Sequence, residues 1–252
     1  MLIGASELMS HTILATDGEI GSVQDLYFDD AHWTVRYLVV DTGTWLPGRQ
    51  VLISPRAVAS PPSGRRIPVA LTKERIEASP SVDTDKPVNR QYEAEYSRYY
   101  QYPPYWLGPY RWGATLLPGE VLAAPLGATV ELVTDDVGGD PHLRSVGDVM
   151  GYYIEAKDGD LGHVEDFLVD PRDWAIRYMA VTTRNWWPGK KVLVAPAWIS
   201  EVRWETSRVR VDLDREQIKS APEFDPSRPV DREYEGRLFA HYGRRHYWDE
   251  PV

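Results

Sequence analysis

Two aspartates, Asp25 and Asp166, are the residues of this chain best placed to do chemistry. Each lies among apolar residues of an expected strand. A carboxylate in such a place can act as a general acid or base, or bind a metal. The structural alternative is that it pairs with a recurring arginine, Arg36 or Arg177, or accepts hydrogen bonds from backbone N–H groups. We expect the structural role, because no histidine or serine recurs beside either aspartate.

Other chemical motifs are weak or absent. The six histidines form no H-x-x-x-H pair, and the chain has no cysteine for a thiolate or a zinc site. The acids of the segment 135–140 lack the glycine and glutamate of a calcium loop. Phosphate-binding and nucleophile-elbow motifs do not occur. We therefore expect no catalytic residues, no metal and no cofactor.

The elements that position the two aspartates are repeated. The segment from Asp17 to Pro55 returns without a gap from Asp158 to Pro196. Short runs rich in β-branched and aromatic residues, bounded by turn residues, predict strands in each copy. In the first copy we expect strands at 11–15, 19–28, 34–40, 50–53, 57–60 and 67–70. Gly21 interrupts the second of these and indicates a bulge or a tight bend.

Each copy continues into a helical arm. A short helix at 72–78 begins at Thr72, and an amphipathic helix spans 89–101, with its counterpart at 231–243. The long helix follows a proline-rich loop, so we expect its aromatic stripe to pack against the sister unit. Stacking of unpaired bases is the alternative, but few basic residues are interleaved. The residues predicted for inter-repeat packing are Tyr92, Tyr96, Tyr99, Tyr100, Trp106, Tyr234, Leu238, Tyr242 and Trp248.

These patterns predict a mainly β fold with two small six-stranded barrels, each followed by a short helix and an amphipathic helix. Closure of a barrel removes exposed strand edges. We expect a first domain at 1–106, a Pro/Gly-rich linker at 107–146 with enough apolar residues to lie over the domains, and a second domain at 147–248. The two domains should form an internal pseudo-dimer about a twofold axis, and further homo-oligomerisation stays open.

One pattern runs through both copies and reads, in the first, Asp17-Gly-x-x-Gly21-x-Val23-x-Asp25, Asp29, Trp33-x-x-Arg36-Tyr37 and Val51-Leu-Ile-x-Pro55. It resembles the PRC-barrel domain. This β-barrel occurs in the cytoplasmic part of the photosynthetic reaction centre H subunit and at the C-terminus of the ribosome maturation factor RimM. The segments 71–106 and 213–248 are similar to the tail of bacterial tandem PRC-barrel proteins. The resemblance implies adaptor or assembly roles instead of catalysis.

Charge and hydropathy limit the classes of partner and the location that we expect. The net charge is −10 and is spread evenly, so duplex nucleic acid and anionic lipid are not expected as direct partners. No apolar run of 18 residues predicts a membrane span, and the first residues do not form a signal peptide. A cytoplasmic location is expected, with peripheral attachment to a membrane complex through a partner as an alternative.

Two loops are the candidates for binding a protein partner. A tryptophan before Pro-Gly can anchor in a partner's pocket, although it can also fold back to cap its barrel. The candidate residues are Trp45, Pro47, Trp186, Trp187 and Pro188. We expect a non-enzymatic protein–protein adaptor. The alternatives are a peripheral component of a photosynthetic or respiratory membrane complex, and an enzyme or small-ligand protein that uses an interdomain cleft.

Overall fold

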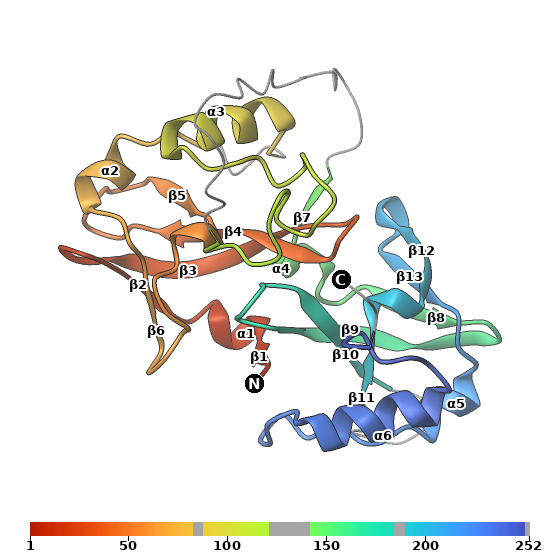
Figure 1. Ribbon diagram of the computed structural model, residues 1–252. Coiled ribbons are helices and arrows are strands. Elements are labelled where there is room, and N and C mark those ends of the chain that lie inside the picture. The colour runs from red at the N-terminus through yellow and green to blue at the C-terminus, as the bar shows by residue number, and fades with distance from the viewer. Residues whose placement is uncertain (83–87, 121–141, 184–189, 250–252) are drawn as a thin grey trace. The chain divides into compact units, whose positions relative to one another are not determined.

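The computed structural model describes residues 1–82, 88–120, 142–183 and 190–249. The fold is mainly β and contains two sheets with a few helices (Figure 1). Contacts divide the chain into two compact units. The N-terminal unit consists of residues 7–146 and 171–175. The C-terminal unit consists of residues 1–6, 147–170 and 176–252.

The sheet of the N-terminal unit has six strands. They are β2 (Thr12–Ala15), β3 (Gly18–Asp29), β4 (Thr34–Asp41), β5 (Gln50–Ile53), β6 (Arg66–Pro68) and β7 (Leu143–Ser145). The order is β5-β4-β3-β2-β6, and β7 pairs with β3. The strand expected at 57–60 is absent. Pro55 begins a short 3-10 helix, η1 (Pro55–Ala57), and only an isolated bridge at Val58 follows. Pro61 and Pro62 follow directly after this stretch, and proline lacks the N–H that a ladder needs.

Alternation of apolar residues sets the core of this unit. Ile20, Val23, Leu26 and Phe28 of β3 are buried, as the partial alternation in the sequence predicts. Seven of the eight residues of β4 are buried, because this strand lies in the middle of the sheet and is covered by a helix. The core therefore centres on β3 and β4.

The sheet of the C-terminal unit has seven strands, one more than expected. They are β1 (Ile3–Gly4), β8 (Tyr153–Ala156), β9 (Gly159–Val169), β10 (Ile176–Thr182), β11 (Lys191–Val194), β12 (Ile199–Arg203) and β13 (Arg208–Val211). The order is β11-β10-β9-β8-β13-β12, and β1 pairs with β9. The additional strand is β1, because the six strands expected for the second copy are β8 to β13.

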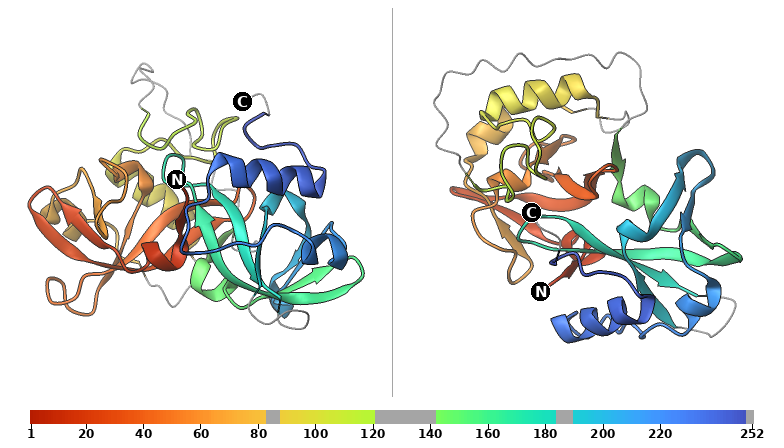
Figure 2. Two further views of the ribbon diagram at one scale, coloured as in Figure 1. Left: turned by 90° about the horizontal axis from the view of Figure 1, so that it is seen from below. Right: turned by 45° about the vertical axis from the view of Figure 1, so that its right-hand side comes forward.

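Each unit carries one short and one long helix after its sheet. They are α2 (Lys73–Glu77) and α3 (Arg90–Tyr100) in the N-terminal unit, and α5 (Arg215–Lys219) and α6 (Arg232–Tyr242) in the C-terminal unit. The predicted cap of the first helix is confirmed, because the Thr72 hydroxyl accepts the N–H of Arg75. Helix α3 lies over β4 and β5 in both views (Figures 1 and 2). In the described residues, no helix is long and apolar enough to span a membrane.

The compact units differ from the continuous domains 1–106 and 147–248, because the copies exchange their first strands. The Cα register pairs Gly4 of β1 with Leu168 of β9, and Ser145 of β7 with Tyr27 of β3. These are corresponding positions of the repeat. Each sheet thus takes one strand from the segment that precedes the other copy. The chain changes unit within two short helices, α1 (Ala5–Leu8) and α4 (Val146–Val149).

Gly21 confirms the expected irregularity of β3. The register of β2 and β3 shifts beside it, and an added Cβ would lie 1.9 Å from the carbonyl oxygen of Asp41. Gly162, at the same position of the second copy, would meet the carbonyl oxygen of Thr182 at the same distance. The backbone of the sheet therefore leaves no room for a side chain at this position.

Replacement of Gly21 by alanine tests this packing. We expect Gly21→Ala to destabilise the protein by about 3 kcal/mol, because the backbone of Asp41 must move. The measurement is the midpoint of urea unfolding followed by far-UV circular dichroism. Gly236→Ala is the control, since nothing lies within 4 Å of its added Cβ in α6. An equal effect of the two substitutions would contradict the close approach.

Candidate functional site

Asp166 holds the exchanged strand β1 on the C-terminal sheet. It follows a bulge, because the register of β9 and β10 skips Glu165. Its Oδ1 accepts the N–H of Phe167 at 2.8 Å and the N–H of Ser6 at 3.0 Å. Its Oδ2 accepts the Ser6 hydroxyl at 2.6 Å. A bulge turns a side chain away from the regular alternation, so this carboxylate faces the edge strand.

Asp25 does the same in the N-terminal unit. The register of β3 and β4 skips the residue before it. Its Oδ1 accepts the N–H of Leu26 at 2.7 Å, and its Oδ2 accepts the hydroxyl of Ser145 from β7. Both aspartates are therefore acceptors for backbone and hydroxyl groups. Among the residues that the structure describes, no group of three or more histidines and carboxylates could hold a metal ion.

The two recurring arginines pair with other carboxylates than expected. Arg36 Nε lies 2.7 Å from Asp29 Oδ2, and Arg177 Nη2 lies 3.3 Å from Asp170 Oδ2. The cause is a second bulge in each hairpin, at which Arg36 and Arg177 are the skipped residues of β4 and β10. The bulge places each arginine beside the end of the neighbouring long strand. Asp25, in contrast, is opposite Val39.

Arg36 is 1% exposed, and aromatic rings surround it. Its guanidinium carbon lies 3.8 Å from the Tyr105 ring centre and 4.8 Å from that of Trp112. Nη1 donates to the carbonyl oxygen of Arg111. Burial opposes ionisation of Asp29, but a hydrogen bond from His32 and the charge of Arg36 outweigh it, so the pKa of Asp29 lies below its ordinary value. The pair stays charged in an aromatic environment.

The arm helices pack on their own sheets, which differs from the expected packing between repeats. In the N-terminal unit, the Tyr96 hydroxyl donates to the carbonyl oxygen of Leu52 and accepts the N–H of Ser54. Tyr37 of β4 meets the Tyr96 ring edge-on, at 5.1 Å between centres. The other stripe residues bind nearby carbonyls or rings: Tyr92 at Pro80, Tyr99 at Arg75, Tyr100 against Tyr96, and Trp106 over Arg90.

Helix α6 repeats this arrangement in the C-terminal unit. Leu238 is fully buried, and the Tyr242 ring lies 4.6 Å from that of Trp198 in η2 (Pro196–Trp198). The Tyr234 hydroxyl donates to the carbonyl oxygen of Pro222, and Trp248 lies over the guanidinium of Arg232. The apolar stripe of each helix matches the face of the sheet that precedes it, so the helix returns to that sheet after the loop.

Two buried glutamates that the sequence analysis missed fix these helices. Glu93 of α3 is fully buried and binds the Tyr105 hydroxyl at 2.7 Å, Arg90 Nη1 at 3.0 Å and His142 Nε2 at 2.6 Å. Burial and the Glu93 charge raise the pKa of Tyr105 well above its ordinary value. The Tyr105 phenol therefore stays protonated and donates its hydrogen bond to Glu93.

Glu235 of α6 is the counterpart of Glu93. It binds the hydroxyls of Tyr178 at 2.9 Å and Tyr247 at 3.0 Å, and Arg232 Nη1 at 3.0 Å. A usable signal existed in the sequence. The spacing Arg-x-x-Glu, followed by tyrosine twelve residues later, occurs in both arms.

The first Trp-Pro-Gly loop is held by Thr42, which is buried. The Thr42 Oγ1 lies 2.7 Å from the carbonyl oxygens of Leu46 and Arg49, and its own carbonyl accepts the N–H of Trp45. Trp45 is half-buried, with Lys73 Nζ 5.5 Å from its ring centre, and Pro47 is exposed. The candidates Trp186, Trp187 and Pro188 lie outside the described residues.

Part of the expected linker is built into the N-terminal unit. Trp112 is buried, its Nε1 donates to the carbonyl oxygen of Asp173, and its carbonyl accepts a hydrogen bond from Arg56. Tyr110, Leu116 and Leu117 of the same segment are exposed. The apolar runs 121–124 and 130–133, on which the expected packing of the linker rests, lie outside the described residues.

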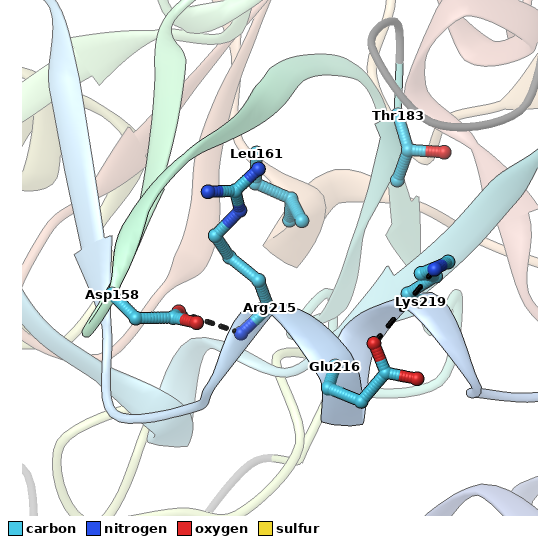
Figure 3. A pocket seen from close by; sticks show the side chains of 6 residues that line it. All are labelled: Asp158, Leu161, Thr183, Arg215, Glu216 and Lys219. Carbon is cyan, nitrogen blue, oxygen red and sulfur yellow. Dashed lines mark hydrogen bonds and ion pairs between the residues drawn. The ribbon is translucent and has the colours of Figure 1, made fainter.

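A small pocket lies in the C-terminal unit (Figure 3). Its volume is about 110 Å³. It is lined by Asp158, Leu161, Thr183, Arg215, Glu216 and Lys219. Asp158 Oδ1 accepts the N–H of Arg215 at 2.8 Å, and Lys219 Nζ lies 3.8 Å from Glu216 Oε2. Pockets for organic ligands measure roughly 300–1,000 Å³, so this one is too small for such a ligand.

The buried glutamate of α3 gives a stability prediction. We expect Glu93→Gln to lower the free energy of unfolding by about 3 kcal/mol, because Arg90 and His142 lose their charged partner. Thermal unfolding and limited proteolysis at α3 measure the effect. Glu95→Gln, an exposed change in the same helix, serves as the control and should change little. Similar losses for both variants would argue against the role of Glu93.

The Asp29–Arg36 pair gives a pH prediction. Because the folded-state pKa of Asp29 is lowered, its contribution to stability is present above the unfolded pKa of about 4 and is lost as pH falls through the folded value. Urea unfolding between pH 7 and pH 2 should show that the advantage of the natural protein over Asp29→Asn shrinks below about pH 4. An advantage that stays constant down to pH 2 would exclude this ionisation.

Comparison with known families identifies part of the chain. Residues 2–75 match the PRC-barrel domain. The matched segment contains β1, the strands β2 to β6 and the first three residues of α2. A search of curated proteins found no match to the chain. The chain therefore contains a PRC-barrel domain at residues 2–75, and the first strand of that sequence domain lies in the C-terminal unit.

Proposed function

We propose that this chain is a cytoplasmic, non-enzymatic adaptor that binds another protein through the loop 42–49. The observation that carries the proposal is how the recurring polar residues are used. Asp25, Asp29, Arg36 and Glu93 are hydrogen-bonded within the N-terminal unit, where they hold strands and a helix in place. The loop, in contrast, leaves Trp45 half-buried and Pro47 exposed. PRC-barrel domains are consistent with such a role.

The loop is preorganised for binding. The Thr42 hydroxyl bridges its two ends, and the guanidinium of Arg49 donates to the carbonyl oxygens of Glu77 and Ser79 at the end of α2. A partner that binds Trp45 therefore does not have to order the loop, which reduces the entropic cost of association. Tryptophan is also among the residues most often found at the centre of binding energy in interfaces.

Contacts in the second copy support a second binding loop, equivalent to the loop 42–49. Thr183 Oγ1 donates to the carbonyl oxygen of Lys190, and Lys190 Nζ donates to the carbonyl oxygens of Lys219 and Ala221. These contacts correspond to those of Thr42 and Arg49. We therefore include Trp186, Trp187 and Pro188 on sequence grounds, and we infer a tandem PRC-barrel protein from the repeat and the matching strand order. Two loops on one chain would allow bivalent binding of a partner.

Site-specific photo-crosslinking tests the adaptor role. We expect a benzoylphenylalanine residue at position 45 to give a discrete covalent adduct with one protein in cells of the source organism. For that partner, Trp45→Ala should weaken binding at least about tenfold, because a central aromatic anchor is lost. Tyr153, an exposed aromatic residue of the C-terminal unit, is the control position. No adduct at position 45, or the same adducts at both positions, would refute the proposal.

A further inference from the structure

The two exchanged segments each contain one serine, but at different positions of the repeat. The segment before the first copy reads Gly4-Ala5-Ser6, and the segment before the second reads Ser145-Val146-Gly147. With respect to the repeat, Gly4 corresponds to Ser145 and Ser6 to Gly147. Each segment therefore offers one hydroxyl to an aspartate, but from a different residue of the strand.

The acceptor site around Asp166 fits only the first of these segments. Gly4 packs against the carboxylate, and an added Cβ would lie 2.7 Å from Asp166 Oδ2. That oxygen already accepts the Ser6 hydroxyl. With a serine in the place of Gly4, the carboxylate would have to move away from its position beside Ser6. The site thus selects a glycine followed two residues later by a hydroxyl-bearing residue.

The acceptor site around Asp25 has the opposite preference. Here the residue in the place of Gly4 is Ser145, and its hydroxyl donates directly to Asp25 Oδ2. Arg144 of the same strand adds an ion pair with Asp30, in which Nε lies 2.9 Å from Oδ2. The segment 1–6 has Ile3 in the place of Arg144 and cannot make this pair. The two acceptor sites are therefore not interchangeable.

We propose that the Asp166 site is a strand-acceptor site in trans, and that its partner is the segment 1–6 of a second copy of this chain. The segment is held by two residue pairs with β9 and by Asp166, and its residues belong to the C-terminal unit while Glu7 belongs to the other unit. These contacts are the same whether the segment comes from the same chain or from another. Reciprocal exchange between two copies closes as a symmetric dimer.

Concentration decides between the two forms. Exchange within one chain has the advantage of an effective concentration on the order of millimolar for a short connection. In dilute solution the segment 1–6 therefore stays on the sheet of its own chain, and no dimer forms by exchange. Dimers form when the local concentration of the chain approaches that value. This self-association goes beyond the adaptor role and does not depend on Trp45.

Cysteine pairing tests the proposal cleanly, because the chain has no cysteine of its own. Ile3 and Val169 are register partners across β1 and β9. One copy carries Ile3→Cys and the other Val169→Cys, and the two are mixed at high concentration under mild oxidation. We expect a disulfide-linked heterodimer on a denaturing gel. A single chain with both substitutions should form the internal disulfide, which checks that the geometry permits the bond.

Two controls test the selectivity of the site. Arg144 takes the place of Ile3 in the other segment, so a mixture of Arg144→Cys with Val169→Cys should give no heterodimer. Adding Ser6→Ala to the Ile3→Cys copy should leave the equilibrium yield nearly unchanged, because the hydroxyl is lost in the internal and in the exchanged form alike. It should speed the formation of the heterodimer about tenfold, since a hydrogen bond to a charged acceptor no longer holds the segment. Ser145→Ala in the same copy should leave this rate unchanged.

Each result of the cysteine experiments either supports or refutes exchange in trans or its selectivity. If the internal disulfide forms but the heterodimer does not, exchange in trans is refuted. If Arg144→Cys links to Val169→Cys as well as Ile3→Cys does, the selectivity of Asp166 is refuted. A heterodimer that forms with Ile3→Cys alone, and forms faster with Ser6→Ala, supports the proposal.

Discussion

The hydrogen bonds from the exchanged strands to Asp166 and Asp25 are the interactions on which the two units depend. Each carboxylate sits at a bulge, where the strand turns its side chain toward the edge. Each then binds a segment more than a hundred residues away in the chain. Neither half of the sequence contains a complete sheet, because β1 and β7 each lie outside the copy they complete. The folding of the two units is therefore coupled through the chain itself.

Buried charge is the second constraint, and its geometry explains the aromatic composition. Arg36 is enclosed by Tyr105 and Trp112, and Glu93 accepts hydrogen bonds from tyrosine and ionic partners. Charges removed from water are costly unless every group finds a partner. Tyrosine and tryptophan suit this task, because they bury a large apolar surface and still donate a hydrogen bond. The excess of these residues over phenylalanine thus serves the fit between each arm helix and its sheet.

Sequence reasoning succeeded where the signal is local. The strands β2 to β5 and the helix cap at Thr72 follow from neighbours a few residues apart. It failed where strand register or the path of the chain determines which residues meet. Arg36 pairs with Asp29 because a bulge between β3 and β4 shifts its position. The spacing of charged residues in the sequence does not reveal such a bulge. The arm helix returns to its own sheet for a similar reason: an aromatic stripe shows that a face is buried, not what buries it.

Comparison of the two copies separates what holds the fold from what distinguishes its halves. The features that occur twice, such as the acid at the bulge, the arginine–carboxylate pair and the buried glutamate, all have structural contacts within a unit. Some of the features that differ lie at the exchanged segments. Gly4 and Ser145, Ile3 and Arg144, and the single His142 on Glu93 lie on or beside the exchanged segments. A repeat with identical edges could pair its segments either way. These differences fix which segment completes which sheet, and they guard against an ambiguous pairing of the segments.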